Sequence, residues 1–216
     1  MSNVHHRLSG LYVITDGQSR SLQVLIDRAR AVLDGGARVL QYRDKTDDAP
    51  RRLREALALC GLCRDAGALF IVNDDSRLAA ACGADGVHLG RDDGAIDQAR
   101  GLLGPEALIG VSCYNSLERA EALQRAGASY LAFGAVYPSP TKPGAIQVSM
   151  DTLREARQRF KLPLVAIGGI TAENAAPLAA LGLDALAVIS AVFSAAEPAT
   201  AARRICQVMQ AAREYQ

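Results

Sequence analysis

The sequence has no tryptophan, few other aromatic residues and no excess of charge of either sign. Its 24 Lys and Arg residues nearly balance 23 Asp and Glu residues, which leaves a formal net charge of +1. A chain that holds a nucleic acid or an anionic membrane through its overall field needs a larger basic excess. We therefore expect neither partner, and any basic residue important for function must act locally.

Long hydrophobic runs are also missing. No segment approaches the roughly 20 apolar residues that span a bilayer, and residues 1–7 contain no apolar run of the kind found in signal peptides. The expected location is the cytoplasm. The sequence does not decide the oligomeric state, and a homo-oligomer is one option.

The cysteines do not form a recognisable disulfide framework, because they are odd in number and scattered along the chain. We expect reduced thiols. Cys60 and Cys63 have the spacing of a redox motif, but the stretch around them has a helical pattern, which favours a packing role. The five positions are Cys60, Cys63, Cys82, Cys113 and Cys206.

Short apolar runs alternate with amphipathic helical patterns along the whole chain. Because the runs are continuously apolar, they suit parallel strands buried on both faces. The eight runs are Leu11–Thr15, Val39–Tyr42, Leu69–Val72, Gly86–Leu89, Leu108–Val111, Tyr130–Phe133, Leu164–Ile167 and Ala185–Ile189. Eight strand–helix units in a chain of 216 residues fit one (β/α)8 TIM barrel, which typically takes roughly 200–250 residues.

We therefore predict an α/β fold with a single TIM-barrel domain over residues 1–216, in which residues 1–9 form a flexible N-terminus. An open doubly wound sheet shares the alternation. It is disfavoured because no Gly-x-Gly-x-x-Gly pattern follows the first run and no Walker loop is present.

Polar residues gather just after the expected strands, which is where barrel enzymes place their active sites. They are Gln41, Arg43, Lys45, Asn73, Asp74, His88, Asp93, Ser112, Ser139, Thr141, Lys142, Gly168, Gly169 and Ser190. No need of packing or capping explains so many such residues at one rim. Their shared position predicts a functional site.

Two parts of this rim suit phosphate groups. Gly168, Gly169 and Ser190 match the phosphate-binding loops that many barrels form after strands seven and eight, although a tight turn would also explain the glycines. Arg43 and Lys45 lie within reach of Asp74 and Asp93, which suits a diphosphate held with Mg2+. Lys142 could add a third cation. This pattern indicates two phosphorylated substrates or one bisphosphate.

Seven motifs, in order along the chain, resemble those of the thiamine phosphate synthase (thiamine-phosphate pyrophosphorylase) family. They are Gln41-Tyr-Arg-Asp-Lys45, Val72-Asn-Asp-Asp75, Gly86-Val-His-Leu-Gly-Arg-Asp-Asp93, Gly110-Val-Ser112, Tyr137-Pro-Ser-Pro-Thr-Lys142, Ala166-Ile-Gly-Gly-Ile170 and Val188-Ile-Ser190. The resemblance implies a transferase of thiamine biosynthesis. Such an enzyme joins 4-amino-2-methyl-5-(diphosphooxymethyl)pyrimidine to a thiazole phosphate, with or without a 2-carboxylate, and releases thiamine phosphate and pyrophosphate.

The resemblance also implies roles for individual residues, with Arg43, Lys45, Ser112 and Lys142 as the catalytic ones. The pyrimidine diphosphate would be held by Gln41, Tyr42, Arg43, Asp44, Lys45, Asn73, Ser112 and Lys142. The thiazole phosphate would be held by Ser139, Pro140, Thr141, Gly169, Ile189 and Ser190. One Mg2+ per site would be bound by Asp74 and Asp93.

The chain departs from the family pattern at Ser139, Arg91 and Cys113, and the roles of Arg91 and His88 stay open. We expect His88 to be an interior histidine with satisfied hydrogen bonds, and residues 138–144 to close over the diphosphate. The expected chemistry is dissociative, with a pyrimidine cation formed before the thiazole nitrogen attacks.

Three alternatives use the same barrel. A thiazole tautomerase would need no Mg2+–diphosphate site, an aldolase would typically carry a Schiff-base lysine inside a strand, and a binding module would have lost turnover. None of the expected strands contains a lysine. The motif residues around Asp74 and Asp93 favour the synthase over the other two.

Overall fold

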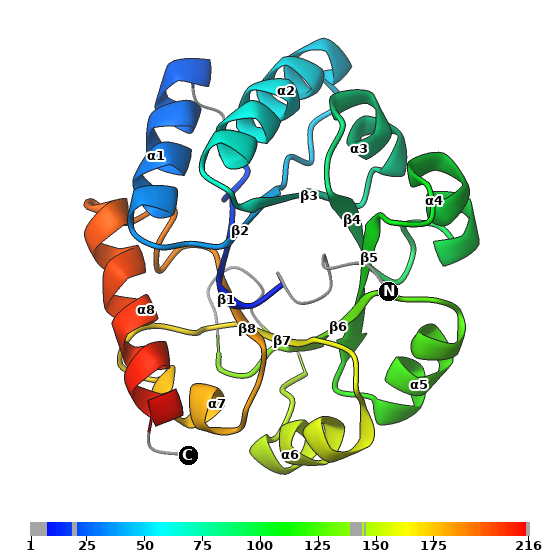
Figure 1. Ribbon diagram of the computed structural model, residues 1–216, viewed down its shortest axis with the longest axis vertical. Helices are drawn as coiled ribbons and strands as arrows, with labels where there is room; N and C mark the ends of the chain where they lie inside the picture. Colours follow the sequence, from blue (N-terminus) through cyan, green and yellow to red (C-terminus); the bar gives the residue numbers. More distant parts are fainter. Residues whose placement is uncertain (1–7, 19–20, 139–143, 145, 215–216) are drawn as a thin grey trace.

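The computed structural model describes residues 8–18, 21–138, 144 and 146–214. In this part of the chain a closed ring of eight parallel strands is surrounded by eight helices (Figure 1). Each strand pairs with the next along the chain, and β8 pairs with β1. The predicted TIM barrel is confirmed.

The strands lie close to the predicted runs. Their bounds are β1 Gly10–Ile14, β2 Val39–Tyr42, β3 Leu69–Asn73, β4 Gly86–Leu89, β5 Leu108–Tyr114, β6 Tyr130–Gly134, β7 Leu164–Ile167 and β8 Ala185–Val188. The largest difference is at β5, which continues three residues past the predicted end at Val111. Its register against β6 shifts between Ser112 and Tyr114, so an irregular strand end replaces the expected loop.

The helices return the chain to the start of the next strand. Their bounds are α1 Leu22–Asp34, α2 Ala49–Asp65, α3 Ser76–Cys82, α4 Ile96–Leu103, α5 Leu117–Arg125, α6 Met150–Arg159, α7 Ala176–Ala180 and α8 Pro198–Glu214. Ser or Asp side chains cap the N-termini of α1, α2, α3, α5 and α6 by accepting a backbone N–H of the first turn. At Gly83 the left-handed conformation (φ 69°) ends α3 and lets β4 begin three residues later.

Two separate hydrophobic cores follow from the alternation of side chains along each strand. The larger one fills the space between the strands and the surrounding helices. The smaller one fills the inside of the barrel and includes Tyr12, Ile71 and Tyr130. Leu8 also belongs to the interior core and is buried, so the predicted flexible N-terminus does not extend to this residue.

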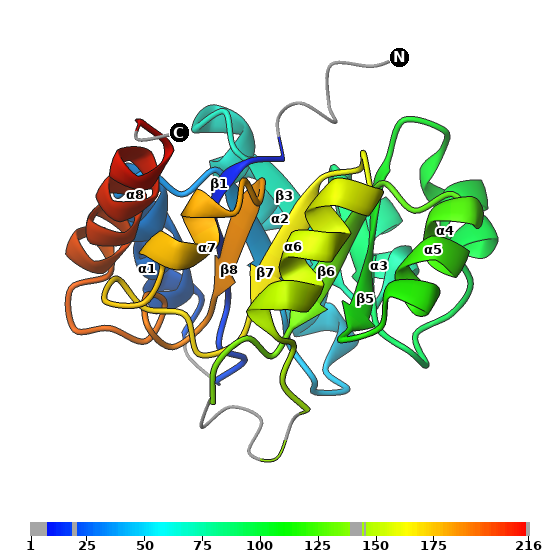
Figure 2. The same cartoon turned by 90° about the horizontal axis from the view of Figure 1, so that it is seen from below.

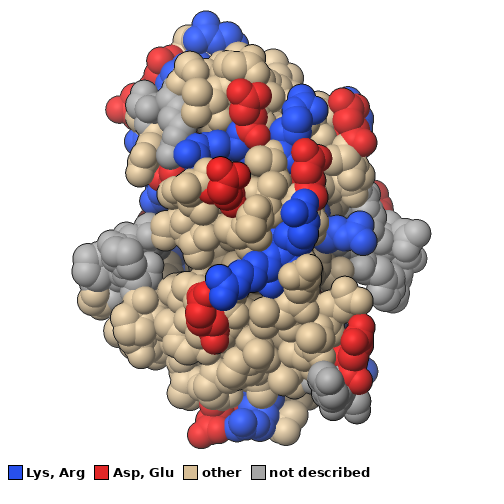
Figure 3. All heavy atoms as spheres, turned by 90° about the vertical axis from the view of Figure 1, so that its left-hand side faces the viewer, with Lys and Arg blue, Asp and Glu red and all other residues tan. Residues whose placement is uncertain are grey.

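The cysteines are all free and lie in the packed layers or close to them. Cys60 and Cys63 lie on the buried side of α2, which confirms their packing role. Within the described ranges no helix has both the length and the apolar character that crossing a bilayer requires. On the face shown in Figure 3, basic and acidic side chains are interspersed.

The interior core leaves no room at Gly110, which pairs with Tyr130 across β5 and β6. A Cβ added there would overlap the Tyr130 ring. We expect Gly110→Ala to lower the free energy of unfolding by about 3 kcal/mol or more. The matched control is Gly101→Ala in α4, where a Cβ meets no atom within 4 Å, and a gain of about 0.5–1 kcal/mol is expected. Urea denaturation measures both, and equal effects of the two substitutions would contradict the packing account.

Candidate active site

A cavity of about 380 Å³ opens at the end of the barrel where the strands finish. In Figure 2 the loops that follow the strands lie together at the lower end of the barrel. All eight strands, or the residues directly after them, contribute side chains to the cavity wall. Five of the residues to which the resemblance gave a role line it, namely Gln41, Arg43, Asn73, Ser112 and Ile189, and so do His88 and Gly168. Its size lies in the range of roughly 300–1,000 Å³ that is typical of pockets for small organic ligands.

A chain of hydrogen bonds crosses the floor of this cavity. Gln41 Nε2 donates to the Tyr12 hydroxyl at 2.7 Å, and the Tyr12 and Tyr130 hydroxyls are 2.9 Å apart. The Tyr130 hydroxyl lies 3.1 Å from Nδ1 of His88, whose Nε2 lies 2.9 Å from Oγ of Ser112. The predicted interior position of His88 is confirmed, with both ring nitrogens engaged.

One set of directions gives each tyrosine hydroxyl of this chain both a donor and an acceptor, and it starts from the first hydrogen bond. The Gln41 amide nitrogen can only donate, so the hydrogen of the buried Tyr12 hydroxyl is available to Tyr130. In this set Tyr130 donates to Nδ1 of His88, and Nε2 of a neutral His88 carries the proton donated to Ser112. Burial raises the pKa of both tyrosines well above the ordinary value, so they keep their protons at neutral pH. Ser112 is left to donate its own hydrogen into the cavity.

Beside the cavity, Lys45, Asp74 and Asp93 form a charged cluster. Lys45 Nζ contacts Asp74 Oδ2, and the two carboxyl groups lie within hydrogen-bonding distance of each other. Burial and the neighbouring Asp93 raise the pKa of Asp74. Burial also acts to raise the pKa of Asp93, but hydrogen bonds from Asp74 and the Gly90 N–H outweigh it and lower that pKa. Asp74 is thus the carboxyl group of the pair that holds a proton more readily.

The charged cluster has the donors that a hard divalent cation requires. Asp74 and Asp93 offer carboxylate oxygens, and among the described residues no group of three or more His, Cys, Asp or Glu could hold a metal ion. A cation here would need further oxygen ligands, such as water or a bound phosphate. Mg2+ typically binds in this way, through one or two carboxylates and the phosphates of a substrate.

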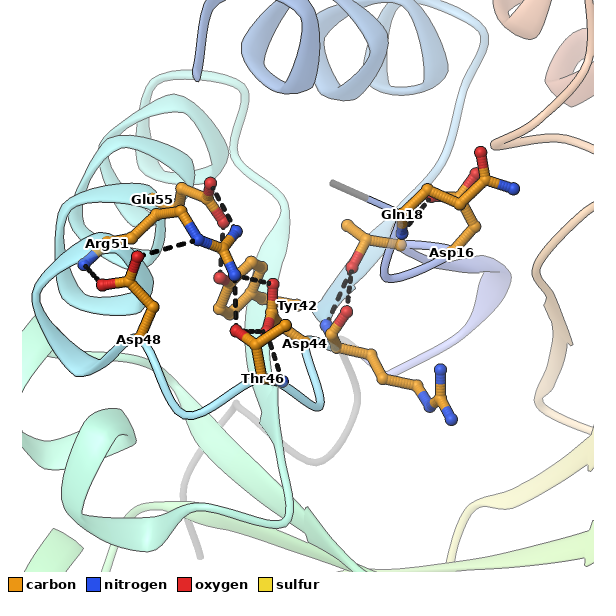
Figure 4. A network of polar contacts seen from close by, with 10 residues as sticks. Asp16, Gln18, Tyr42, Asp44, Thr46, Asp48, Arg51 and Glu55 are labelled. Carbon is orange, nitrogen blue, oxygen red and sulfur yellow. Dashed lines mark hydrogen bonds and ion pairs between the residues drawn. The ribbon is translucent and has the colours of Figure 1, made fainter. Parts of the chain in front are cut away.

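Tyr42 and Asp44, which the resemblance assigned to the diphosphate, direct their side chains away from the cavity and toward α2 (Figure 4). The reason is the alternation of the chain, because Gln41 and Arg43 face the cavity and their neighbours must face outward. Tyr42 donates to Glu55, and Asp44 pairs with Arg51. A contact between either side chain and the diphosphate has no support in this geometry.

The loops after β7 and β8 hold the remaining predicted residues that the structure describes. Gly168 and Gly169 both have positive φ, and a Cβ on Gly169 would overlap Tyr137 and Pro138. The turn itself therefore requires these glycines, whether or not a phosphate binds there. Ser190 is exposed directly after Ile189. Ser139, Pro140, Thr141 and Lys142 lie outside the described residues, as does most of the loop expected to close.

Tyr114 and Asn115 also line the cavity. They were not predicted as site residues, because the fifth strand was expected to end at Val111. A run of polar residues directly after Val111 was the available signal. Arg91 also lines the cavity, and its guanidinium lies over the Tyr114 ring, 4.9 Å from the centroid. This contact provides the partner of Arg91 that the sequence left open.

Comparison with known proteins identifies the family. A family model described as thiamine monophosphate synthase matches residues 11–192. The chain belongs to the thiamine monophosphate synthase family. The thiamine-phosphate synthase of Thioalkalivibrio sulfidiphilus is 50% identical over 97% of this chain and 100% of its own length. That of Halorhodospira halophila is 50% identical over 99% and 100%, respectively.

A solved structure supports the same assignment. Thiamine phosphate pyrophosphorylase from Pyrococcus furiosus superposes with a TM-score of 0.87 and 36% identity, covering 97% of this chain and 99% of that one. The resemblance to thiamine phosphate synthases inferred from the motifs is therefore confirmed, and with it a transferase of thiamine biosynthesis. Likeness to a Streptococcus mutans protein titled KGPDC, at 15% identity and a TM-score of 0.73, shows the barrel fold alone.

The hydrogen-bond chain makes a prediction about His88. We expect its neutral ring to carry the proton on Nε2, as 15N NMR of labelled protein can show. His5→Gln and His6→Gln variants identify the signals of the other two histidines. In Tyr130→Phe the donor to Nδ1 is lost, so the ring should populate both tautomers and the free energy of unfolding should fall by about 1–3 kcal/mol. A proton on Nδ1 in the unaltered protein would refute the proposed directions.

Proposed function

We propose that this chain displaces pyrophosphate from 4-amino-2-methyl-5-(diphosphooxymethyl)pyrimidine with the nitrogen of a thiazole phosphate, in a Mg2+-dependent reaction that yields thiamine phosphate. Family membership supplies the reaction class. The observation that carries the residue assignment is the shared cavity: Gln41, Arg43, Asn73 and Ser112 converge in it. Lys45 lies beside them with the two carboxyl groups that suit a divalent cation.

The diphosphate half of the site is assigned from the positive charges of its side chains. The guanidinium of Arg43 and the ammonium of Lys45 would stabilise the negative charge that accumulates on the departing pyrophosphate. Ser112, whose proton the hydrogen-bond chain directs into the cavity, would donate to the substrate. Asp74 and Asp93 would hold Mg2+, which when bound neutralises further charge on the diphosphate. Lys142, outside the described residues, would add a third cation.

The thiazole half would lie on the side of β7 and β8. Gly169, Ile189 and Ser190 would hold the thiazole phosphate there, together with Ser139, Pro140 and Thr141 from the loop after β6. Ile189 lines the cavity beside the apolar side chains of Val165 and Ile167. An apolar wall excludes water, which would otherwise capture the pyrimidine cation of a dissociative route.

No protein nucleophile is needed in this scheme, because the thiazole nitrogen attacks directly. Cys113, the neighbour of Ser112, is fully buried, and burial raises the pKa of its thiol to about 12. It therefore stays protonated at neutral pH. We also propose that the protein works in the cytoplasm, because its cysteines are free and its substrates are phosphorylated.

The direct test is to incubate the purified protein with the pyrimidine diphosphate, the thiazole phosphate and Mg2+, and to follow thiamine phosphate after oxidation to fluorescent thiochrome. Product that disappears when Mg2+ is removed by chelation is the expected result. Running the carboxylated and the plain thiazole phosphate in parallel determines the preferred acceptor. Tight binding of the thiazole phosphate without any product would refute the synthase assignment.

The metal assignment makes a separate prediction. Asp93→Asn removes one charged ligand, so the Mg2+ concentration for half-maximal rate should rise by about tenfold or more. Asp92→Asn is the matched control, because Asp92 is the exposed neighbour and is not a proposed ligand. Both variants are titrated with Mg2+ at saturating substrates after circular dichroism has verified folding. An unchanged Mg2+ requirement in Asp93→Asn would remove Asp93 from the metal site.

A further inference from the structure

The segment after β2 carries Arg43 and Lys45, and its shape is held from outside the cavity. Tyr42 precedes these two cations and Asp44 lies between them, and both side chains face α2 rather than the cavity (Figure 4). The side chains of Asp44 and Glu55 are only 5% and 6% exposed. Their contacts therefore operate in a poorly solvated layer, where a satisfied ion pair fixes geometry more strictly than at the surface.

Arg51, in the first turn of α2, contacts two residues of this segment and one residue of its own helix. Its Nη2 lies 2.8 Å from Asp44 Oδ2 and 2.5 Å from Thr46 Oγ1, and its Nη1 lies 3.0 Å from Glu55 Oε1. The other oxygen of Glu55 accepts the Tyr42 hydroxyl at 2.6 Å. Arg51 and Glu55 thus join residues 42, 44 and 46 to one rigid helix, and the planar guanidinium sets the angles as well as the distances.

The opposite side of the same segment is held by Thr15, the residue directly after β1. The buried Thr15 hydroxyl accepts the Arg43 N–H at 2.8 Å and donates to the Arg43 carbonyl at 3.1 Å. The backbone of Arg43 is therefore fixed by Thr15, while its two neighbours are fixed through α2. Only the side chain of Arg43 is left to face the cavity.

Stability alone is a weak reason for such a network. Replacing a buried ion pair by apolar side chains of similar size is often neutral or stabilising, because the charges no longer have to be desolvated. Hydrogen bonding to Asp44 raises the pKa of Arg51, so the guanidinium stays charged at any working pH. A better explanation for the network is that it fixes the conformation of the segment that carries Arg43 and Lys45.

We propose that Arg51, oriented by Glu55, is a positioning residue that holds Arg43 and Lys45 in place for the diphosphate. This inference rests on the proposed function, since it concerns the same diphosphate site. Neither Arg51 nor Glu55 lines the substrate cavity, so their effect must pass through the segment they hold.

The test measures binding of inorganic pyrophosphate in the presence of Mg2+ by calorimetry on Arg51→Met, with Arg54→Met as the matched control. Arg54 is an exposed arginine three residues further along α2. We expect the dissociation constant for pyrophosphate to rise about tenfold in Arg51→Met and to stay unchanged in Arg54→Met. The KM for the pyrimidine diphosphate should rise with it, while the KM for the thiazole phosphate stays the same.

This design separates positioning from a purely structural role. If Arg51→Met only reduced the folded fraction, the number of binding sites would fall while the dissociation constant stayed constant, and that outcome overturns the proposal. Should Arg51→Met fail to fold, Glu55→Gln replaces it. This variant keeps an oxygen acceptor for Tyr42 but loses the charge that orients Arg51, and a selective rise in the same constant is again expected.

A different result would refute the proposed function. If the unaltered protein binds pyrophosphate but forms no thiamine phosphate, the synthase assignment falls, and the comparison of dissociation constants still decides the role of Arg51. If the unaltered protein does not bind pyrophosphate at all, the positioning proposal is overturned as well. Arg51→Lys should restore only part of the affinity, because an ammonium group cannot match the fork of contacts to Asp44, Thr46 and Glu55.

Discussion

The pairing of β8 with β1 is the constraint on which the site depends. With the sheet closed and all strands parallel, every strand ends at the same rim, so residues as distant in sequence as Gln41 and Ile189 line one cavity. Closure also separates the side chains of each strand into two groups. One group meets inside the barrel and the other packs against the helices.

The interior of the barrel combines an apolar core with a polar chain that leads to the site. Tyr12 and Tyr130 are fully buried, yet each hydroxyl is satisfied by its neighbours in the chain from Gln41 to Ser112. Buried hydroxyl groups without partners would cost free energy, so this chain is a condition of stability as well as a source of direction. The same contacts that fill the barrel also underlie the expectation that Nε2 of His88 carries the proton.

The outer layer contributes to function by a different route. At β2 the inward residues Gln41 and Arg43 face the substrate cavity, while Tyr42 and Asp44 pair with α2. Residues that face the cavity and residues that pair with the crossover helix therefore alternate within a few positions of the chain. The diphosphate site is in this sense built by two layers, one that would bind and one that holds the binding segment in position.

Eight strands, a single barrel and the family were all predictable from the sequence, because continuous apolar runs, the alternation with helices and the strand-end motifs are local properties of the chain. It also placed Gln41, Arg43, Asn73 and Ser112 correctly at one rim. The folded chain was needed to show that β5 continues to Tyr114, that Leu8 is buried and that Tyr42 and Asp44 face outward. These features depend on strand register and on contacts between separate segments. A linear pattern does not encode which side of a strand faces the centre of a closed barrel.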